Sequence, residues 1–197
     1  MTQAESQNLI ENRIKERREA TTFTQRPPFP RNIMVELTNA CNHKCIFCAN
    51  PKMEREVGRI DPKLLTRVLG EAYRLGAREI GFYTTGDPLI HNDLPEFVRE
   101  AKAIGFEYAY ISTNGALASK ERIQQIVDAG IDSVKFSINA GDRTTYALIH
   151  GRDDWDIVIK NLKYLSALRG TIGRELKLAI TYVVTDQNRS QMSAFQD

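Results

Sequence analysis

The 197-residue chain carries 27 Lys and Arg against 25 Asp and Glu, a formal net charge of +2, with 42% apolar and 26% charged residues. This composition is typical of one folded domain with a sizeable core, and the charge is too mild to indicate a nucleic-acid partner. The amino terminus is charged and has no apolar centre, which argues against a secretory signal, and no apolar run approaches the ~18 residues of a membrane span.

Residues 1–31 are expected to form an amino-terminal arm with a proline-rich lead-in. The first 25 or so are polar and show only weak helical spacing of apolar residues. The sequence R-P-P-F-P at 26–30 then excludes a helix and indicates extended chain. The core domain is expected over residues 32–197.

From Ile33 onward a strand, a polar loop, an amphipathic helix and a glycine recur along the chain. Strands are predicted at about 33–38, 79–84, 108–112, 133–137 and 176–184. Helices are predicted at about 61–76, before Gly105, before Gly130, at about 153–169, and from about 189. Regular alternation of this kind predicts βα units and a parallel sheet.

The predicted strands alternate between apolar and polar residues. In the strand at 133–137, Val134 and Phe136 share one face, and Lys135 and Ser137 share the other. A parallel sheet covered by helices on both faces would be apolar throughout. We therefore predict an α/β fold of the partial (βα)6-type TIM barrel, with a polar inner face around a cavity. About five βα units are present, so the domain is expected to be truncated at its carboxyl end.

Polar residues gather where four successive strands are predicted to end, the place where parallel α/β folds bind ligands. They lie at 41–48, 84–88, 112–115 and 137–141. Taken singly, sequences such as Gly-Asp-Pro and Thr-Asn-Gly are common turns. Their coincidence at neighbouring strand ends predicts one site.

The first of these loops holds all three cysteines, Cys41, Cys45 and Cys48, spaced C-x3-C-x2-C. An odd number in one short segment argues against a disulfide framework and for reduced thiols in the cytoplasm. Structural zinc uses four ligands, usually in two pairs, and the only candidate for a fourth is His43 inside the tight loop. A thioredoxin-like role would use Cys45 and Cys48 and leave Cys41 unexplained. An iron–sulfur cube normally takes four thiolates, so three would leave one iron with an open position.

In this context the chain resembles the radical S-adenosylmethionine (SAM) superfamily, with a MoaA/SPASM-like core, over about residues 32–185. C-N-H-K-C-I-F-C at 41–48 is similar to the family's cysteine signature, in which an aromatic residue, here Phe47, precedes the third cysteine. T-G-D-P at 85–88 resembles the family's Gly-Gly-Glu-Pro motif, with Thr85 and Asp87 as departures. Ser137 and Asn139 resemble the ribose-contacting position.

The resemblance implies a radical SAM enzyme whose three cysteines hold a [4Fe–4S] cluster, with SAM on the open iron. The implied SAM-binding residues are Phe47 at the adenine, Thr85, Gly86 and Asp87 at the methionine ammonium, and Ser137 and Asn139 at the ribose. An electron from a donor such as flavodoxin or ferredoxin cleaves SAM, and the 5′-deoxyadenosyl radical takes hydrogen from a peptide, a sugar or a cofactor precursor. Thr85 and Asp87 predict weaker or shifted SAM contacts, and no catalytic residue is assigned.

Two cations are further candidates. Lys135, on the inner face, would contact the SAM carboxylate or an acidic substrate, or simply extend its charge into a wet lumen. Arg152 would reach the carboxylate or act as a solvated helix-end partner. We expect His91 and His150 on the surface.

Competing hypotheses are a non-catalytic module holding zinc or a cluster, and a family member that keeps the cluster without turnover.

Overall fold

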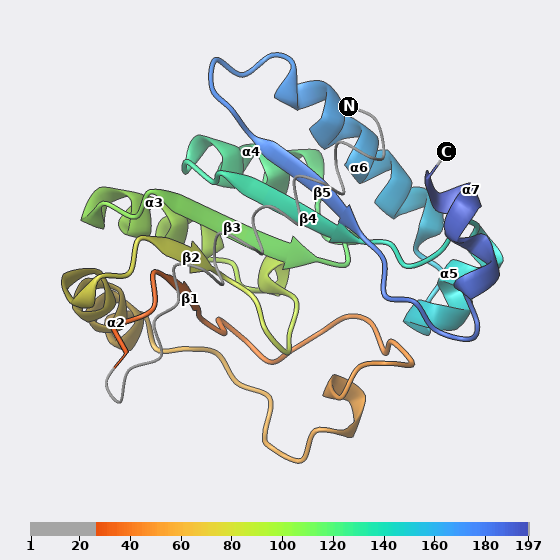
Figure 1. Cartoon of the computed structure of the whole chain (residues 1–197), viewed down its shortest axis with the longest axis horizontal. Coiled ribbons are helices and arrows are strands. Elements are labelled where there is room, and N and C mark those ends of the chain that lie inside the picture. The colour runs from red at the N-terminus through yellow and green to blue at the C-terminus, as the bar shows by residue number, and fades with distance from the viewer. Residues whose placement is uncertain (1–26, 197) are drawn as a thin grey trace.

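The computed structural model describes residues 27–196, which form a parallel sheet with helices packed along one face (Figure 1). The strands are β1 (Asn32–Met34), β2 (Glu79–Gly81), β3 (Tyr108–Thr113), β4 (Ser133–Ser137) and β5 (Lys177–Thr181). The helices are α2 (Pro62–Leu75), α3 (Leu94–Ile104), α4 (Lys120–Asp128), α5 (Arg143–His150), α6 (Trp155–Arg169) and α7 (Met192–Gln196). Most of the predicted arm lies outside the described residues.

The strand order in the sheet is β1-β2-β3-β4-β5, and every neighbouring pair is parallel. A doubly wound sheet would reverse this order at a switch point. Here each new strand adds on the same side of the preceding one, and α2, α3, α4 and α6 all cover one face of the sheet (Figure 1). This is the arrangement of a curved, partial barrel. The fold prediction is therefore confirmed. No helix in the described part of the chain is long and apolar enough to cross a membrane.

The two faces of the sheet differ as the sequence predicts. The face toward the helices is apolar and fully buried, and includes Ile80, Phe82, Ile111, Val134 and Phe136. The inner face carries Lys135 and a row of tyrosines, with ring centroids of Tyr83 and Tyr110 5.7 Å apart and those of Tyr108 and Tyr110 5.6 Å apart. Burial of the apolar face against the helices holds the sheet, which leaves the inner face free for polar groups.

Helix α5 is an addition to the prediction, because the sequence analysis predicts no helix over its residues. It begins where the Asp142 carboxylate accepts a hydrogen bond from the Thr145 amide, 2.8 Å away, and it ends at Gly151, whose φ is +65°. Its eight residues include two threonines and give little more than two turns of periodicity. Its short buried face, formed by Tyr146, Ile149 and His150, is too brief to stand out in the sequence.

Gly81 and Gly70 provide a matched test of how the inner face packs. A Cβ at Gly81 would lie 2.7 Å from Cζ of Tyr110, whereas a Cβ at Gly70 in α2 would meet nothing within 4 Å. Gly81→Ala should therefore lower the free energy of unfolding by about 1–3 kcal/mol through overpacking. Gly70→Ala should raise it by about 0.5–1 kcal/mol, because alanine favours the helix. Urea denaturation checks both, and an equal effect of the two substitutions would contradict this packing.

Candidate metal centre at the carboxyl ends of the strands

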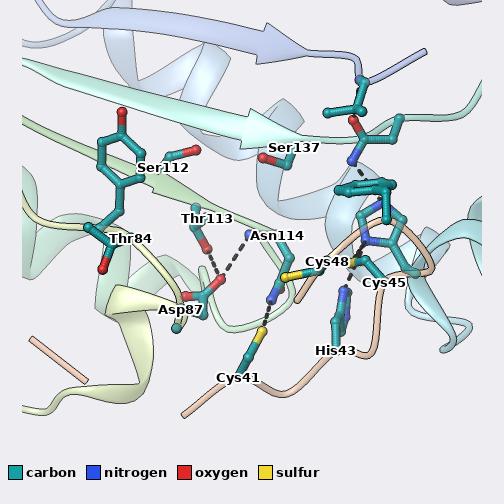
Figure 2. Close-up of a pocket in the computed structure, with 16 residues that line it drawn as sticks. Cys41, His43, Cys45, Cys48, Thr84, Asp87, Ser112, Thr113, Asn114 and Ser137 are labelled. Atoms are coloured by element: carbon teal, nitrogen blue, oxygen red, sulfur yellow. Dashed lines mark hydrogen bonds between the residues drawn. The ribbon is translucent and has the colours of Figure 1, made fainter. Parts of the chain in front are cut away.

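The three cysteines line one cavity of about 190 Å³ together with residues that follow β2, β3 and β4 (Figure 2). The sequence-predicted residues that line it with them are Phe47, Gly86, Asp87, Ser137 and Asn139. The loops that the sequence placed at one edge of the sheet therefore do enclose a common space. Phe47 is 41% exposed, an unusual degree for an aromatic residue, and it lines this cavity.

The cysteine loop, residues 41–48, is tightly turned. The Cys48 amide donates to the Cys45 carbonyl at 3.0 Å, and the Asn50 amide donates to Sγ of Cys48 at 3.4 Å. The side-chain amide of Asn114, from the loop after β3, lies 3.9 Å from Sγ of Cys41. Two loops thus hold the sulfur atoms toward the cavity.

Burial raises the pKa of the Cys45 thiol to about 12, and the charges of Cys41 and Cys48 add to this effect. Burial likewise raises the pKa of Cys41. Because burial and mutual repulsion oppose ionisation, thiolates at both positions need a cation to form. A metal centre supplies that charge, and binding it would release protons.

The donor set fits an iron–sulfur cluster. Three soft sulfur ligands face one cavity, and the sequence contains no fourth cysteine. One ring nitrogen each of His43 and His150 also lies within 4.8 Å of Sγ of Cys45. A single ion bound by those three atoms would leave Cys41 and Cys48 without a role.

Gly86 brings the loop after β2 against the loop after β1. A Cβ at this position would lie 2.3 Å from the carbonyl oxygen of Thr38 and 2.5 Å from that of Ala40. The next amide, of Asp87, donates to the Ala40 carbonyl at 2.9 Å. Only glycine allows the two loops to come this close. The glycine that the chain shares with the family motif at residue 86 therefore has a steric role in this structure.

The Asp87 carboxylate is fully enclosed and joins the second loop to the third (Figure 2). It accepts hydrogen bonds from the Leu89 amide at 3.0 Å, the Thr113 hydroxyl at 2.8 Å and the Asn114 amide at 2.8 Å. Burial raises the pKa of Asp87, and the three donors oppose that rise. The carboxylate oxygens are thus occupied by protein donors.

Asn139 combines a strained backbone with a structural side chain. Its φ is +58°, the only positive value at a non-glycine in the described residues, a conformation that asparagine tolerates. Its Oδ1 accepts from the Val183 amide at 2.8 Å, and its carbonyl accepts from the Asn188 side chain at 2.9 Å. Asn139 thereby fixes the chain that leaves β5 beside the cavity.

Three predicted residues lie outside the cavity lining, namely Thr85, Lys135 and Arg152. The Lys135 ammonium lies over the Tyr110 ring, 5.0 Å from its centroid. The Arg152 guanidinium pairs with Asp154 at 2.8 Å. Their contacts in this structure are with the protein itself.

The prediction that His91 and His150 lie on the surface is wrong, since they are 3% and 1% exposed. The His91 ring packs on Phe97 with centroids 5.1 Å apart. Burial lowers the pKa of His150 to about 4, and its Nδ1 lies 3.4 Å from Sγ of Cys45. The sequence analysis missed this contact because it missed α5. The pair His150-Gly151, a basic residue followed by glycine, is the helix-end signal that could have found it.

Comparison with known proteins agrees with this geometry. The family described as the Radical SAM superfamily matches residues 35–195. GTP 3′,8-cyclase from Chlorobaculum tepidum is 33% identical over 136 residues, covering 68% of this chain and 41% of that protein. PqqA peptide cyclase from Rhodopseudomonas palustris is 31% identical over 160 residues, covering 81% of this chain and 41% of that protein. The matched part of the chain thus covers 41% of the length of each of these two relatives.

Solved structures are similar as well. Streptococcus suis SuiB bound to S-adenosylmethionine superposes with a TM-score of 0.70 at 20% identity, covering 97% of this chain and 40% of that one. BtrN in complex with AdoMet and 2-DOIA gives a TM-score of 0.55 at 25% identity, covering 76% of this chain and 56% of that one. The arrangement of strands and helices is therefore shared with structures of other proteins solved with SAM.

Asp87→Asn tests the link between the second and third loops. The amide NH2 would face a hydrogen-bond donor in place of a carboxylate oxygen, so the free energy of unfolding should fall by about 1–3 kcal/mol. Asp93→Asn is the control, because the exposed Asp93 side chain makes no capping hydrogen bond at α3. Chemical denaturation measures both variants. A loss no larger for Asp87→Asn than for Asp93→Asn would refute the link.

Proposed function

The chain belongs to the radical SAM superfamily, and we propose that it is the cluster- and SAM-binding part of an enzyme that abstracts hydrogen from its substrate. The observation that carries the proposal is the convergence of three cysteines, without a fourth, on a cavity at the carboxyl ends of the strands. A [4Fe–4S] cluster with SAM on its open iron supplies reductive cleavage of SAM and the radical that follows. The residues of the chain bind and orient the reactants.

We propose that Cys41, Cys45 and Cys48 hold the cluster and that the neighbouring lining residues hold SAM. In this proposal Phe47 contacts the adenine, and backbone groups at Gly86 and Asp87 bind the methionine ammonium. Ser137 and Asn139 bind the ribose. Their place in one cavity lining supports this set. Contacts of SAM with Thr85, Lys135 and Arg152 stay predictions, because those residues lie outside the lining.

The proposed substrate is a peptide, a sugar or a cofactor precursor that lies against the inner face of the sheet. Tyr83 belongs both to that face and to the cavity lining, which supports a substrate position beside the cavity. The two relatives described above are named as cyclases of GTP and of the PqqA peptide. The electron is proposed to come from a small donor protein such as flavodoxin or ferredoxin.

A metal-binding module without turnover is the second candidate. The close approach of His43 and His150 to Cys45 favours it, since in the described part of the chain these are the one group of three such side chains whose ligand atoms lie within 4.8 Å of one another. Such a module would bind a single zinc ion in place of a cluster.

Anaerobic reconstitution with iron and sulfide tests the proposal. The chain should show the broad visible absorption of a [4Fe–4S] cluster and, with SAM and dithionite, should release 5′-deoxyadenosine. Cys45→Ala should abolish both signals, because no spare thiolate exists. Ser166→Ala, at an exposed site on α6, should change neither. One equivalent of zinc without iron after anaerobic purification would contradict the enzyme and favour the module.

A further inference from the structure

The last turn of α5 is in backbone contact with the cysteine loop. The carbonyl of His150 accepts from the Lys44 amide at 3.1 Å, and the carbonyl of Ile149 accepts from the Ile46 amide at 2.9 Å. The last carbonyls of a helix have no partner within the helix, so they are free to bind another segment. The two bonds flank Cys45 on both sides.

Gly151 allows the two segments to come this close. Its left-handed φ of +65° ends the helix, and a Cβ at this position would lie 2.8 Å from the carbonyl oxygen of Lys44. Gly76, at the end of α2, also has a positive φ, of +118°, but a Cβ there would meet nothing within 4 Å. Glycine is therefore required at 151 by space as well as by backbone conformation.

The His150 side chain adds a contact to the sulfur itself. Its Nδ1 lies 3.4 Å from Sγ of Cys45, and its Nε2 lies 2.9 Å from the carbonyl oxygen of Ile138 at the end of β4. Its ring stacks on Tyr146 with centroids 4.2 Å apart. The ring is buried and held by β4 on one edge and by its own helix on one face, so it has little freedom to leave the sulfur.

His43 closes the same network from within the cysteine loop (Figure 2). Its Nδ1 lies 3.2 Å from Nδ1 of His150, and its Nε2 lies 3.0 Å from the carboxylate of Asp154. Asp154 stands at the start of α6 and also pairs with Arg152. A continuous set of polar contacts therefore runs from α6 through the cysteine loop to β4.

We propose that the α5 turn, residues 149–151, is the dock that holds the cysteine loop in its ligand geometry, with His150 as a positioning residue for Cys45. The inference rests on the proposed function, because it gives the dock a role only where Cys45 binds the cluster. Contacts that orient metal ligands affect metal affinity about 10- to 100-fold when they are removed. Hydrogen bonds to the sulfur ligands also set the potential of an iron–sulfur cluster. The His150 Nε2–H donates to the Ile138 carbonyl, so Nδ1 turns its lone pair toward Sγ of Cys45 and disfavours the added negative charge of a reduced cluster.

Gly151→Ala and Gly76→Ala separate docking from ordinary helix-end strain. Both place alanine at a left-handed helix end, but only the first pushes against the cysteine loop. After anaerobic reconstitution, Gly151→Ala should lose iron to a chelator about 10-fold faster than the wild-type chain. Gly76→Ala should lose it at the wild-type rate. Equal rates for the two variants would overturn the dock.

His150→Phe tests the sulfur contact, because phenylalanine can keep the stacking on Tyr146 while it loses both ring nitrogens and with them the contacts to Cys45, Ile138 and His43. Its cluster should assemble and show a higher midpoint potential than that of the wild type by EPR-monitored titration, because no nitrogen lone pair then faces the sulfur. An unchanged potential would overturn the positioning role of His150. A wild-type chain that assembles no cluster would instead overturn the proposed function and the dock with it, so the two failures are distinguished before any variant is compared.

Discussion

The cysteine loop has no helix or strand of its own, so its shape depends on the backbone groups that grip it from both sides. On one side the Ala40 carbonyl accepts from the Asp87 amide, an approach that the missing side chain of Gly86 allows. On the other side the amides of Lys44 and Ile46 bind the end of α5. Backbone groups that leave regular structure need partners when they are buried. Here the partners lie in the loop after β2 and at the end of α5, and the sheet positions both.

The same arrangement connects the site to the rest of the fold through buried acids. Asp87 joins the loops after β2 and β3, and Asp154 joins the cysteine loop to α6 by way of His43. A buried carboxylate is costly unless donors surround it. Asp87 accepts three hydrogen bonds from Leu89, Thr113 and Asn114, and that full set is what makes its burial tolerable. The geometry of the cavity thus depends on contacts formed only when all the loops are in place.

Sequence reasoning recovers those parts of this architecture that have a local pattern. The order of strands and helices, the apolar and polar faces of the sheet, and the gathering of loops around the cysteines follow from periodicity, helix-ending glycines and the topology of βα units. Helix α5 does not follow, because its eight residues are too few for a clear apolar face. The burial of His91 and His150 does not follow either, since it arises from segments distant in the chain. The contact between His150 and Cys45 spans 105 residues and no local pattern encodes it.

The departures of this chain from the Gly-Gly-Glu-Pro motif are accommodated by the structure, although the contacts of this stretch with Glu36 do not themselves require a threonine side chain at 85. The backbone amide of Thr85 donates to the Glu36 carboxylate at 3.2 Å, and the Thr84 hydroxyl donates to the same group at 2.6 Å. Glu36, which follows β1, therefore fixes the stretch where the motif has its first glycine. Asp87, one methylene shorter than glutamate, fits the enclosed space between two loops. The hydrogen bonds of Glu36 and Asp87 hold the side chains beside this loop, so the loop backbone keeps its orientation. The substitutions are thus compatible with a binding loop whose ligand contacts are made by its main chain.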